Sequence, residues 1–219
     1  FEDALRITHQ DLEESRREDM ESRHAQYPPI DQVIAGALRR DGSLWMRRPE
    51  HPEFLKFRLG QGTDVARVTI EGADQHSGLP EAIARVRALA DEYSRVAHVP
   101  LVADLRASGG LGLCGPADIL RQARGAIAAQ LAAQYSPAEV IVTCLTSAER
   151  VDGWEWMKWL PHSSSPHSPF GSGIHLASDS TSGKVVLSQL EGLLEARSQG
   201  DPSEVCDLGP DVSSAPKEE

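Results

Sequence analysis

The chain has 219 residues, enough for one domain with or without an appendage, and we expect one α/β domain; with 40% hydrophobic and 25% charged residues the composition is ordinary for a globular protein. Its formal net charge is -11 and no basic cluster interrupts the acidic balance, which disfavours nucleic acid and anionic membrane surfaces as direct partners. No apolar run is long enough to cross a bilayer, and three widely spaced cysteines predict free thiols rather than disulfides or a metal site. Because the chain begins with Phe1 and not Met, we expect a piece of a longer protein, with any membrane anchor upstream.

The first 40 residues are predicted to form a helical stalk. Residues 1–26 are rich in Glu, Asp and Arg, contain neither Gly nor Pro, and carry few apolar side chains, so we expect a mostly solvated helix. Tyr27-Pro28-Pro29 ends it. A second helix over 31–40 has apolar residues on one side and ends at Asp41-Gly42.

The next block predicts a β-hairpin. Apolar and charged residues alternate over 55–59, and Gly60-Gln61-Gly62 can turn the chain into a second alternating strand over 65–71. The lead-in carries Arg47, Arg48 and His51. These residues suit either a ligand site or a solvated loop with local ion pairs.

A helix and a strand follow the hairpin. Pro80 can open a helix that runs to Ser94 with one apolar face, and the short apolar run 100–106 reads as a strand. Ser108-Gly109-Gly110 then turns the chain toward the segment around which the sequence is organised.

That segment, residues 111–135, reads as a buried strand (111–114), a tight turn and an amphipathic helix, which is where a nucleotide-binding fold places its phosphate loop. The turn consists of Gly115, Pro116, Ala117 and Asp118. It has no Lys to meet phosphates and no hydroxyl to hold magnesium, Pro116 removes a backbone donor, and Asp118 would repel an anion. We therefore predict a degenerate, inactive phosphate-loop position.

The apolar run 140–145 predicts a strand that is covered on both faces and completes a right-handed parallel strand-helix-strand unit. A nucleotide hydrolase would end this strand with an acidic residue. Here it ends in Leu145-Thr146-Ser147, and Glu149 comes late for that position. The second part of the hydrolytic machinery is therefore missing as well.

Three of the four tryptophans lie between 154 and 162, where Trp156, Trp159 and Leu160 would share one face of a short helix. That helix could close the sheet edge or present a partner-binding patch. His162, His167 and His175 lie in or beside a Ser/Pro/Gly loop without Cys or carboxylate ligands, which disfavours a metal site.

The chain then predicts a short strand over 174–176 and a closing helix over 184–197. From Ser198 onward it is polar and acidic, and we expect a disordered tail or linker over 198–219.

Several of these motifs, in this order, resemble the EccC/EssC family, the membrane-anchored FtsK/SpoIIIE-type ATPases of type VII secretion. The resemblance extends over most of 44–197 and rests on LWMRRPEHPEFL (44–55), RLG (58–60), PLVADLR (100–106), GLGLCGP (110–116) and WEWMKWLPH (154–162).

The resemblance implies a stalk over 1–40 and, over 44–197, a degenerate ATPase-like domain that precedes the first working ATPase domain of the family. The fold class expected is α/β, a P-loop NTPase-like three-layer fold with a mainly parallel sheet, plus the helical stalk and the β-hairpin. No cofactor is expected in this domain, because ATP and Mg²⁺ belong to downstream domains of the family.

The resemblance also implies an actinobacterial protein at the cytoplasmic face of the inner membrane, held by transmembrane helices outside this sequence. Its partners would be other subunits of the membrane complex, including a ubiquitin-like cytosolic domain, together with the downstream ATPase domains, in a machine that assembles as a hexamer. We expect partner contacts at five positions, namely Trp45, Arg47, Arg48, Trp154 and Trp159.

Three functions follow as hypotheses. The first is a non-catalytic scaffold that transmits movement between the stalk and the downstream motors. The second is an atypical ATPase, in which Arg47, Arg106 or Arg121 supplies positive charge and Glu149 the acid. The third, DNA translocation, is disfavoured by the acidic balance of the chain.

Overall fold

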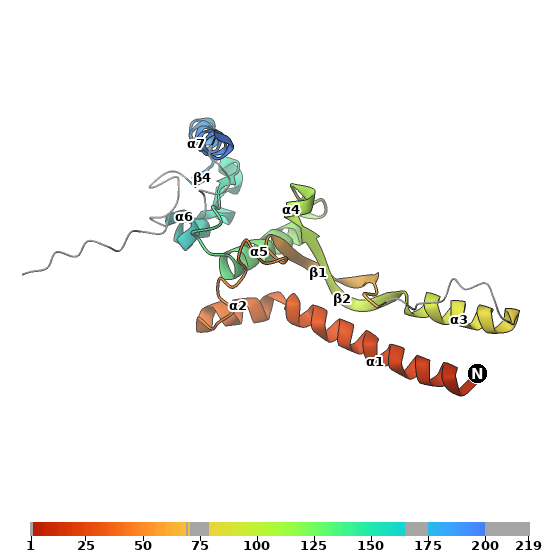
Figure 1. The fold of residues 1–219 in the computed structure, drawn as a ribbon. Helices are drawn as coiled ribbons and strands as arrows, with labels where there is room; N and C mark the ends of the chain where they lie inside the picture. The colour runs from red at the N-terminus through yellow and green to blue at the C-terminus, as the bar shows by residue number, and fades with distance from the viewer. Residues whose placement is uncertain (1, 69, 71–78, 165–174, 200–219) are drawn as a thin grey trace, which may run out of the picture. The chain divides into compact units, whose positions relative to one another are not determined.

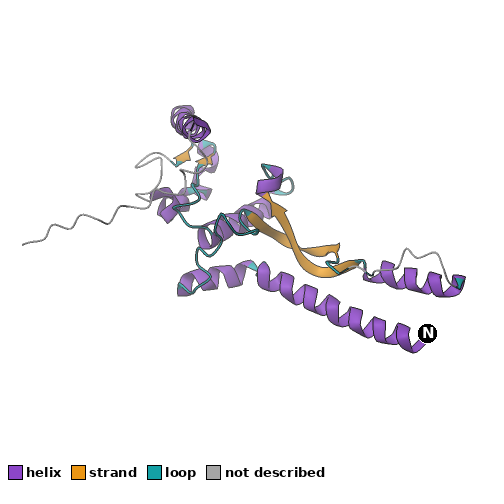
Figure 2. Cartoon of the chain, in the orientation of Figure 1, coloured by secondary structure: helices purple, strands orange, loops and turns teal. Residues whose placement is uncertain are grey.

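The computed structural model describes residues 2–68, 70, 79–164 and 175–199, which divide into two compact units, 1–136 and 137–219 (Figure 1). Helices make up most of the described chain, and the strands form two small sheets (Figure 2). The first unit contains the helices α1, α2, α3, α4 and α5 and the strands β1 and β2. This division places the predicted stalk in the same unit as the segment 44–136. The predicted domain boundaries at 40/44 and 197/198 stay a prediction.

Helix α1 (Glu2–Gln26) confirms the prediction of a long charged helix. Acidic residues lie in its first turn and basic residues in its last turn, as the helix dipole favours. Tyr27 and the two prolines that follow end it, and helix α2 (Ile30–Arg39) begins directly after Pro29. Arg40 then adopts a left-handed conformation with φ of 51°, which ends α2 one residue before the predicted end of the helix at Arg40.

Strands β1 (Lys56–Val65) and β2 (Arg95–Asp104) pair antiparallel, from Lys56 opposite Asp104 to Val65 opposite Arg95. The predicted hairpin is wrong, because residues 60–62 continue β1 instead of turning. Gly62 leaves room for the Leu101 side chain, since a Cβ at this position would lie 2.8 Å from Cδ1 of Leu101.

Helix α3 (Pro80–Tyr93) confirms the helix predicted to begin at Pro80. Strand β2 starts five residues before the predicted strand and ends at Asp104, where helix α4 (Leu105–Ser108) begins. The Asp104 carboxylate accepts a hydrogen bond from the backbone N–H of Ala107, which turns the chain into α4. Leu105 and Arg106, predicted to be in the strand, are therefore helical.

Helix α5 (Ala117–Gln134) confirms the helix predicted after Pro116. The buried strand predicted over 111–114 is wrong, because these residues form an exposed loop and pair with no strand. Three glycines lie at 109, 110 and 112, and such a segment lacks the side chains that would bury a strand. The predicted parallel strand-helix-strand unit loses its first strand.

The core of the first unit gathers where β1, β2 and the end of α5 meet. Phe57, Val99 and Tyr135 are fully buried there. The ring of Tyr135 lies 5.4 Å from that of Phe57 and 5.6 Å from that of Phe54, measured between centroids. This aromatic cluster brings the beginning of β1 against the residue that follows α5.

In the second unit, strands β3 (Cys144–Leu145) and β4 (Leu176–Ala177) pair in parallel. The predicted strand over 140–145 is thus reduced to its last two residues. Helix α7 (Ser180–Gln199) contains the predicted closing helix 184–197, and its Val186 is buried, as are Met157 and Ala177. Ser198 and Gln199, expected to begin the tail, still belong to α7.

The tryptophan segment forms two 3₁₀ helices, η1 (Ala148–Gly153) and η2 (Glu155–Trp159), followed by the short helix α6 (Pro161–Ser164). The short helix predicted to carry Trp156, Trp159 and Leu160 is confirmed in part, because η2 contains the two tryptophans and Leu160 follows it. Ile174, His167 and residues 200–219 lie outside the described residues. The three-layer fold stays a prediction, since the described strands form one antiparallel and one parallel pair.

Candidate functional site

The arrangement with the most specific contacts lies where α1 ends. Side chains from α1, β1, α5 and the segment before β1 meet there. We call this group the stalk junction and define it by Asp19, Arg23, Tyr27, Arg47, Arg58, Gln130 and Tyr135.

The backbone around Arg47 is fixed by the C-terminal end of α5. Trp45 and Arg47 donate their N–H groups to the carbonyl oxygens of Ala133 (2.9 Å) and Gln134 (3.0 Å). The indole Nε1 of Trp45 donates to the carbonyl of Ala132 at 3.1 Å. These bonds satisfy carbonyls that the end of a helix leaves without an intrahelical partner. They also direct the Arg47 side chain inward.

The Arg47 guanidinium connects the end of α1 to the beginning of β1. Its Nη2 donates to the carbonyl of Gln26, the last residue of α1, at 3.0 Å, and its Nη1 donates to the carbonyl of Lys56, the first residue of β1, at 2.6 Å. The Tyr135 hydroxyl donates to the same Lys56 oxygen at 3.0 Å. The guanidinium carbon lies 5.0 Å from the ring centroid of Tyr27, in the geometry of a cation–π contact.

Arg58 and Gln130 extend this network along β1. Arg58 donates to the carbonyl of Tyr27 at 2.7 Å, and burial lowers the pKa of its guanidinium. Gln130 accepts from the backbone N–H of Arg58 and donates to its carbonyl, both at 2.9 Å. The side chain of one α5 residue thus pairs with β1 as a neighbouring strand would.

Asp19 and Arg23 of α1 form a buried ion pair, with 2.9 Å between Oδ1 and Nε. Arg23 also donates to Asp64 at 3.0 Å and to the carbonyl of Val65 at 2.6 Å. Burial by itself raises the pKa of Asp19, but hydrogen bonds from Arg23 and from the backbone of Arg67, with the charges of both, outweigh it and lower the pKa. The hydrogen bond to Asp19 raises the pKa of Arg23.

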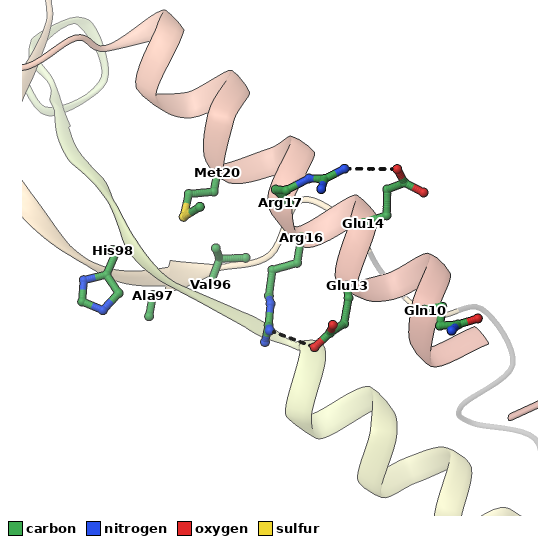
Figure 3. A pocket seen from close by; sticks show the side chains of 9 residues that line it. All are labelled: Gln10, Glu13, Glu14, Arg16, Arg17, Met20, Val96, Ala97 and His98. Atoms are coloured by element: carbon green, nitrogen blue, oxygen red, sulfur yellow. Dashed lines mark hydrogen bonds and ion pairs between the residues drawn. The ribbon is translucent and has the colours of Figure 1, made fainter. Parts of the chain in front are cut away.

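Next to the stalk junction, α1 and β2 form the walls of an open groove of about 660 Å³ (Figure 3). Met20, Val96 and Ala97 supply its apolar side chains. On the helix wall, Arg16 pairs with Glu13 at 3.5 Å and Arg17 with Glu14 at 3.2 Å (Figure 3). The charges of this wall are therefore paired within the helix.

The predicted partner-binding residues lie in different surroundings. Trp45 is half-buried, and Arg47 is only 8% exposed, which disfavours direct contact with a partner. Arg48 is exposed, and its N–H donates to Nδ1 of His51. Trp159 is 81% exposed, and Trp154 stacks on Trp156 with 6.3 Å between ring centroids.

The predicted phosphate-loop position, Gly115 to Asp118, is exposed and leads into the N-terminal end of α5. Of the cations proposed for an atypical ATPase, Arg47 is engaged by backbone oxygens, Arg106 donates to the carbonyl of Pro49 at 3.1 Å, and Arg121 is exposed on α5. Glu149 lies exposed on η1 in the other unit.

The described residues contain no group of three or more His, Cys, Asp or Glu side chains placed to hold a metal ion. His162 and His175 are both buried, and Nδ1 of His175 lies 3.0 Å from the carbonyl of Val142.

Sequence reasoning missed most of the stalk junction. One local signal was available, because Asp19 and Arg23 are spaced i, i+4 on the side of the helix that also carries Leu12 and Met20. Gln130 and Tyr135 gave no local signal, because their hydrogen-bond partners, Arg58 and Lys56, lie 72 and 79 residues away in the sequence. Such contacts depend on the tertiary arrangement.

Comparisons with known proteins give a consistent set of relatives. The chain is 27% identical to the ESX secretion system protein EccC of Geobacillus thermodenitrificans over 172 residues, which are 77% of this chain and 11% of that protein. It is 32% identical to the ESX secretion system protein EccC of Thermomonospora curvata over 126 residues, 56% of this chain and 10% of the relative. The ESX-4 secretion system protein EccC4 of Mycobacterium tuberculosis is 27% identical over 128 residues, 57% and 10% of the two chains.

The similarity therefore covers more than half of this chain but only about a tenth of the length of these relatives. No protein-family model matches the sequence. Among the described residues, none of the helices combines the length and the apolar character that a membrane span requires. The predicted resemblance to EccC proteins is confirmed by these relatives.

Proposed function

Because the chain is homologous to one segment of EccC proteins of ESX secretion systems, we propose that it is the coupling module of such a type VII secretion protein. In this role it connects an N-terminal helical stalk to the domains that follow and hydrolyses no ATP itself. Movement of the stalk would be passed to the β1–β2 sheet and α5.

The stalk junction is the observation that supports this proposal. A helix that transmits movement must be fixed at the end that meets the rest of the protein. Arg47 holds the last carbonyl of α1 and the first carbonyl of β1 with one planar group, and it is itself positioned by the end of α5. Guanidinium donors are fixed relative to one another, so the two elements are held in a defined geometry.

The composition of the phosphate-loop position supports the non-catalytic part of the proposal. Residues 115–118 offer no Lys and no hydroxyl, and Pro116 has no N–H. We also propose that the complete domain has the three-layer fold with a mainly parallel sheet. We further propose that this segment binds no cofactor.

The proposed partners are other subunits of the secretion membrane complex, including a ubiquitin-like cytosolic domain, and the ATPase domains downstream in the same chain. The proposed location is the cytoplasmic face of the membrane, in a hexameric machine. Trp159 is the best candidate for a partner contact, because a tryptophan exposed to 81% is available to be buried in an interface.

Calorimetric titration of the purified chain with Mg-ATP, and with ATP without metal, tests the non-catalytic role. We expect no saturable heat up to millimolar nucleotide. Binding with a dissociation constant near 1 μM, about -8 kcal/mol, would contradict the proposal and support an atypical ATPase.

The coupling role is tested in the full-length secretion protein. Arg47→Ala should reduce secretion while the ATPase activity of the purified protein is retained. Arg39→Ala is the matched control, because Arg39 is exposed and pairs only locally with Asp41. Equal secretion by the two variants, at equal protein levels, would contradict the coupling role.

A further inference from the structure

Helix α1 is attached to the first unit in an unusual way. All of its residues, 2–26, are described, and the ones that are buried are Asp19 and Arg23, an ion pair and not an apolar stripe. Ile7 is half exposed, and Leu5, Leu12 and Met20 are only partly buried. Apolar burial is the usual source of helix docking, so this helix depends largely on polar contacts.

The contacts of α1 with α3 include three polar or aromatic ones. The ring of His9 meets that of Tyr93 edge-on, with 5.5 Å between centroids, and the Arg16 guanidinium lies 5.0 Å from the same ring. Arg85 of α3 forms an ion pair with Glu2, and both side chains are more than half exposed.

The contacts of α1 with the region of β1 are ion pairs and hydrogen bonds, among them the bond from Arg23 to the carbonyl of Val65. Arg23 pairs with Asp64, whose side chain is 53% exposed. Asp19 pairs at 3.6 Å with Arg67, and the Arg67 side chain is 48% exposed. Water and salt reach these partners. Asp19 and Arg23 are themselves buried, so dissolved ions act on these pairs from the side of Asp64 and Arg67, and they weaken the attraction between the helix and the sheet more than they would weaken a closed apolar contact.

The packing between α1 and β2 is incomplete. A groove of about 660 Å³ is lined by residues between 10 and 20 of the helix and by residues 96–98 of the strand (Figure 3), although Val96 is buried and Nε2 of His24 lies 2.8 Å from the carbonyl oxygen of His98. Close packing would otherwise supply dispersion contacts that do not depend on salt.

The C-terminal end of α1 is held differently. The Gln26 carbonyl binds Arg47, the Tyr27 carbonyl binds Arg58, and the Tyr27 ring is buried. Arg47 and the Tyr27 ring are both buried, in contrast to Asp64 and Arg67, the exposed partners of the ion pairs.

We propose that α1 is a releasable arm. It detaches from α3 and the β1–β2 sheet as one element when its ion pairs are screened or outcompeted, and it pivots on its C-terminal end, which Arg47 keeps in place. The competitor would be a charged protein surface that pairs with the acidic and basic side chains of α1. This inference stands on the contacts of the chain and does not rest on the proposed function.

Hydrogen exchange measured by mass spectrometry on the whole chain, in 50 mM and 500 mM NaCl, tests the proposal. We expect peptides from residues 5–20 to exchange about tenfold faster at the higher salt concentration, while peptides from β1 and β2 stay protected. Equal protection of α1 at both salt concentrations would overturn the proposal.

Two variants sharpen the test. Arg23→Ala should release α1 already at 50 mM NaCl, whereas Arg17→Ala should not, because Arg17 pairs only within the helix. If Arg23→Ala speeds exchange in β1 and β2 as well, the whole unit has unfolded. In that case the double variant Asp19→Leu, Arg23→Met tests whether the ion pair controls the release of α1. Apolar side chains in place of the ion pair should keep α1 protected at both salt concentrations. Undiminished salt dependence in the double variant would contradict a role for this pair in the release.

Discussion

The guanidinium of Arg47 donates to the carbonyl of Gln26 at 3.0 Å and thereby joins the end of α1 to a segment that is itself held by α5. Arg47→Ala leaves the carbonyls of Gln26 and Lys56 without this donor. We expect the free energy of unfolding of the first unit to fall by about 2–4 kcal/mol, measured by urea denaturation. Arg39→Ala should change it by less than about 0.5 kcal/mol. A similar loss in both variants would contradict the role given to Arg47.

Arg47→Lys separates charge from geometry. Lysine keeps the positive charge but offers a single ammonium in place of the planar fork that reaches two carbonyls at once. We expect Arg47→Lys to recover less than half of the stability lost in Arg47→Ala. Full recovery would mean that charge alone matters at this position.

Gln130 pairs with the backbone of Arg58 through both its amide oxygen and its amide nitrogen. Gln130→Glu keeps the shape but cannot donate to the Arg58 carbonyl, so we expect a loss of about 2 kcal/mol in the free energy of unfolding. Gln122→Glu, at an exposed position of the same helix, is the control and should be nearly neutral. Thermal denaturation of both variants compares them directly.

Asp19 makes the stability of the first unit depend on acid. Its pKa is lowered below the ordinary value of 3.8 in the folded chain, so it contributes stability above that value and loses it as the pH falls through the folded pKa. Asp19→Asn should therefore be less stable than the natural chain by about 3 kcal/mol at pH 7, and the difference should shrink below pH 3.8. The exposed Asp11→Asn is the control. A difference that does not change with pH would contradict the assignment.

His98 has a φ of 59°, a left-handed conformation that costs a residue with a side chain about 1 kcal/mol. It lies where two residues of β2 lie opposite one residue of β1, between the pairs Gly62 with Val99 and Asp64 with Val96. His98→Gly should remove this strain, but glycine also gives the unfolded chain more conformational freedom, so the net gain in the free energy of unfolding should be about 0.5 kcal/mol. The midpoint of thermal unfolding should therefore rise by a few degrees. Ala97→Gly should lower the midpoint. A lower midpoint in His98→Gly would show that the imidazole itself contributes to stability.

The helices of this chain could be predicted because their signals are local. The absence of Gly and Pro predicted α1, and a proline at or directly before the first helical residue predicted α3 and α5. The pairing of β1 with β2 could not be predicted in the same way. The paired residues of the two strands lie about 30 to 50 residues apart in the sequence. Glycine usually marks a turn, but here Gly62 leaves room for the Leu101 side chain against β1.

The candidate site was predicted only as single residues. Trp45 and Arg47 were chosen for their chemistry, and the sequence could not show that α5 supplies the carbonyls that hold them. For Leu111 and Leu113 the sequence predicted burial that the structure does not have, because an apolar run is buried only if some other element covers it. In the first unit of this chain no described strand pairs with them.

The position of Tyr135 in the chain has a consequence for synthesis on the ribosome. Helix α1 is made first, but the residues that fix its end include Tyr135 and the carbonyls of Ala133 and Gln134, close to the end of the first unit. Contacts between residues so far apart in sequence form late in folding. The nascent stalk therefore waits for about a hundred further residues to emerge before it can take its final direction, and a chaperone or a neighbouring subunit could bind it during that interval.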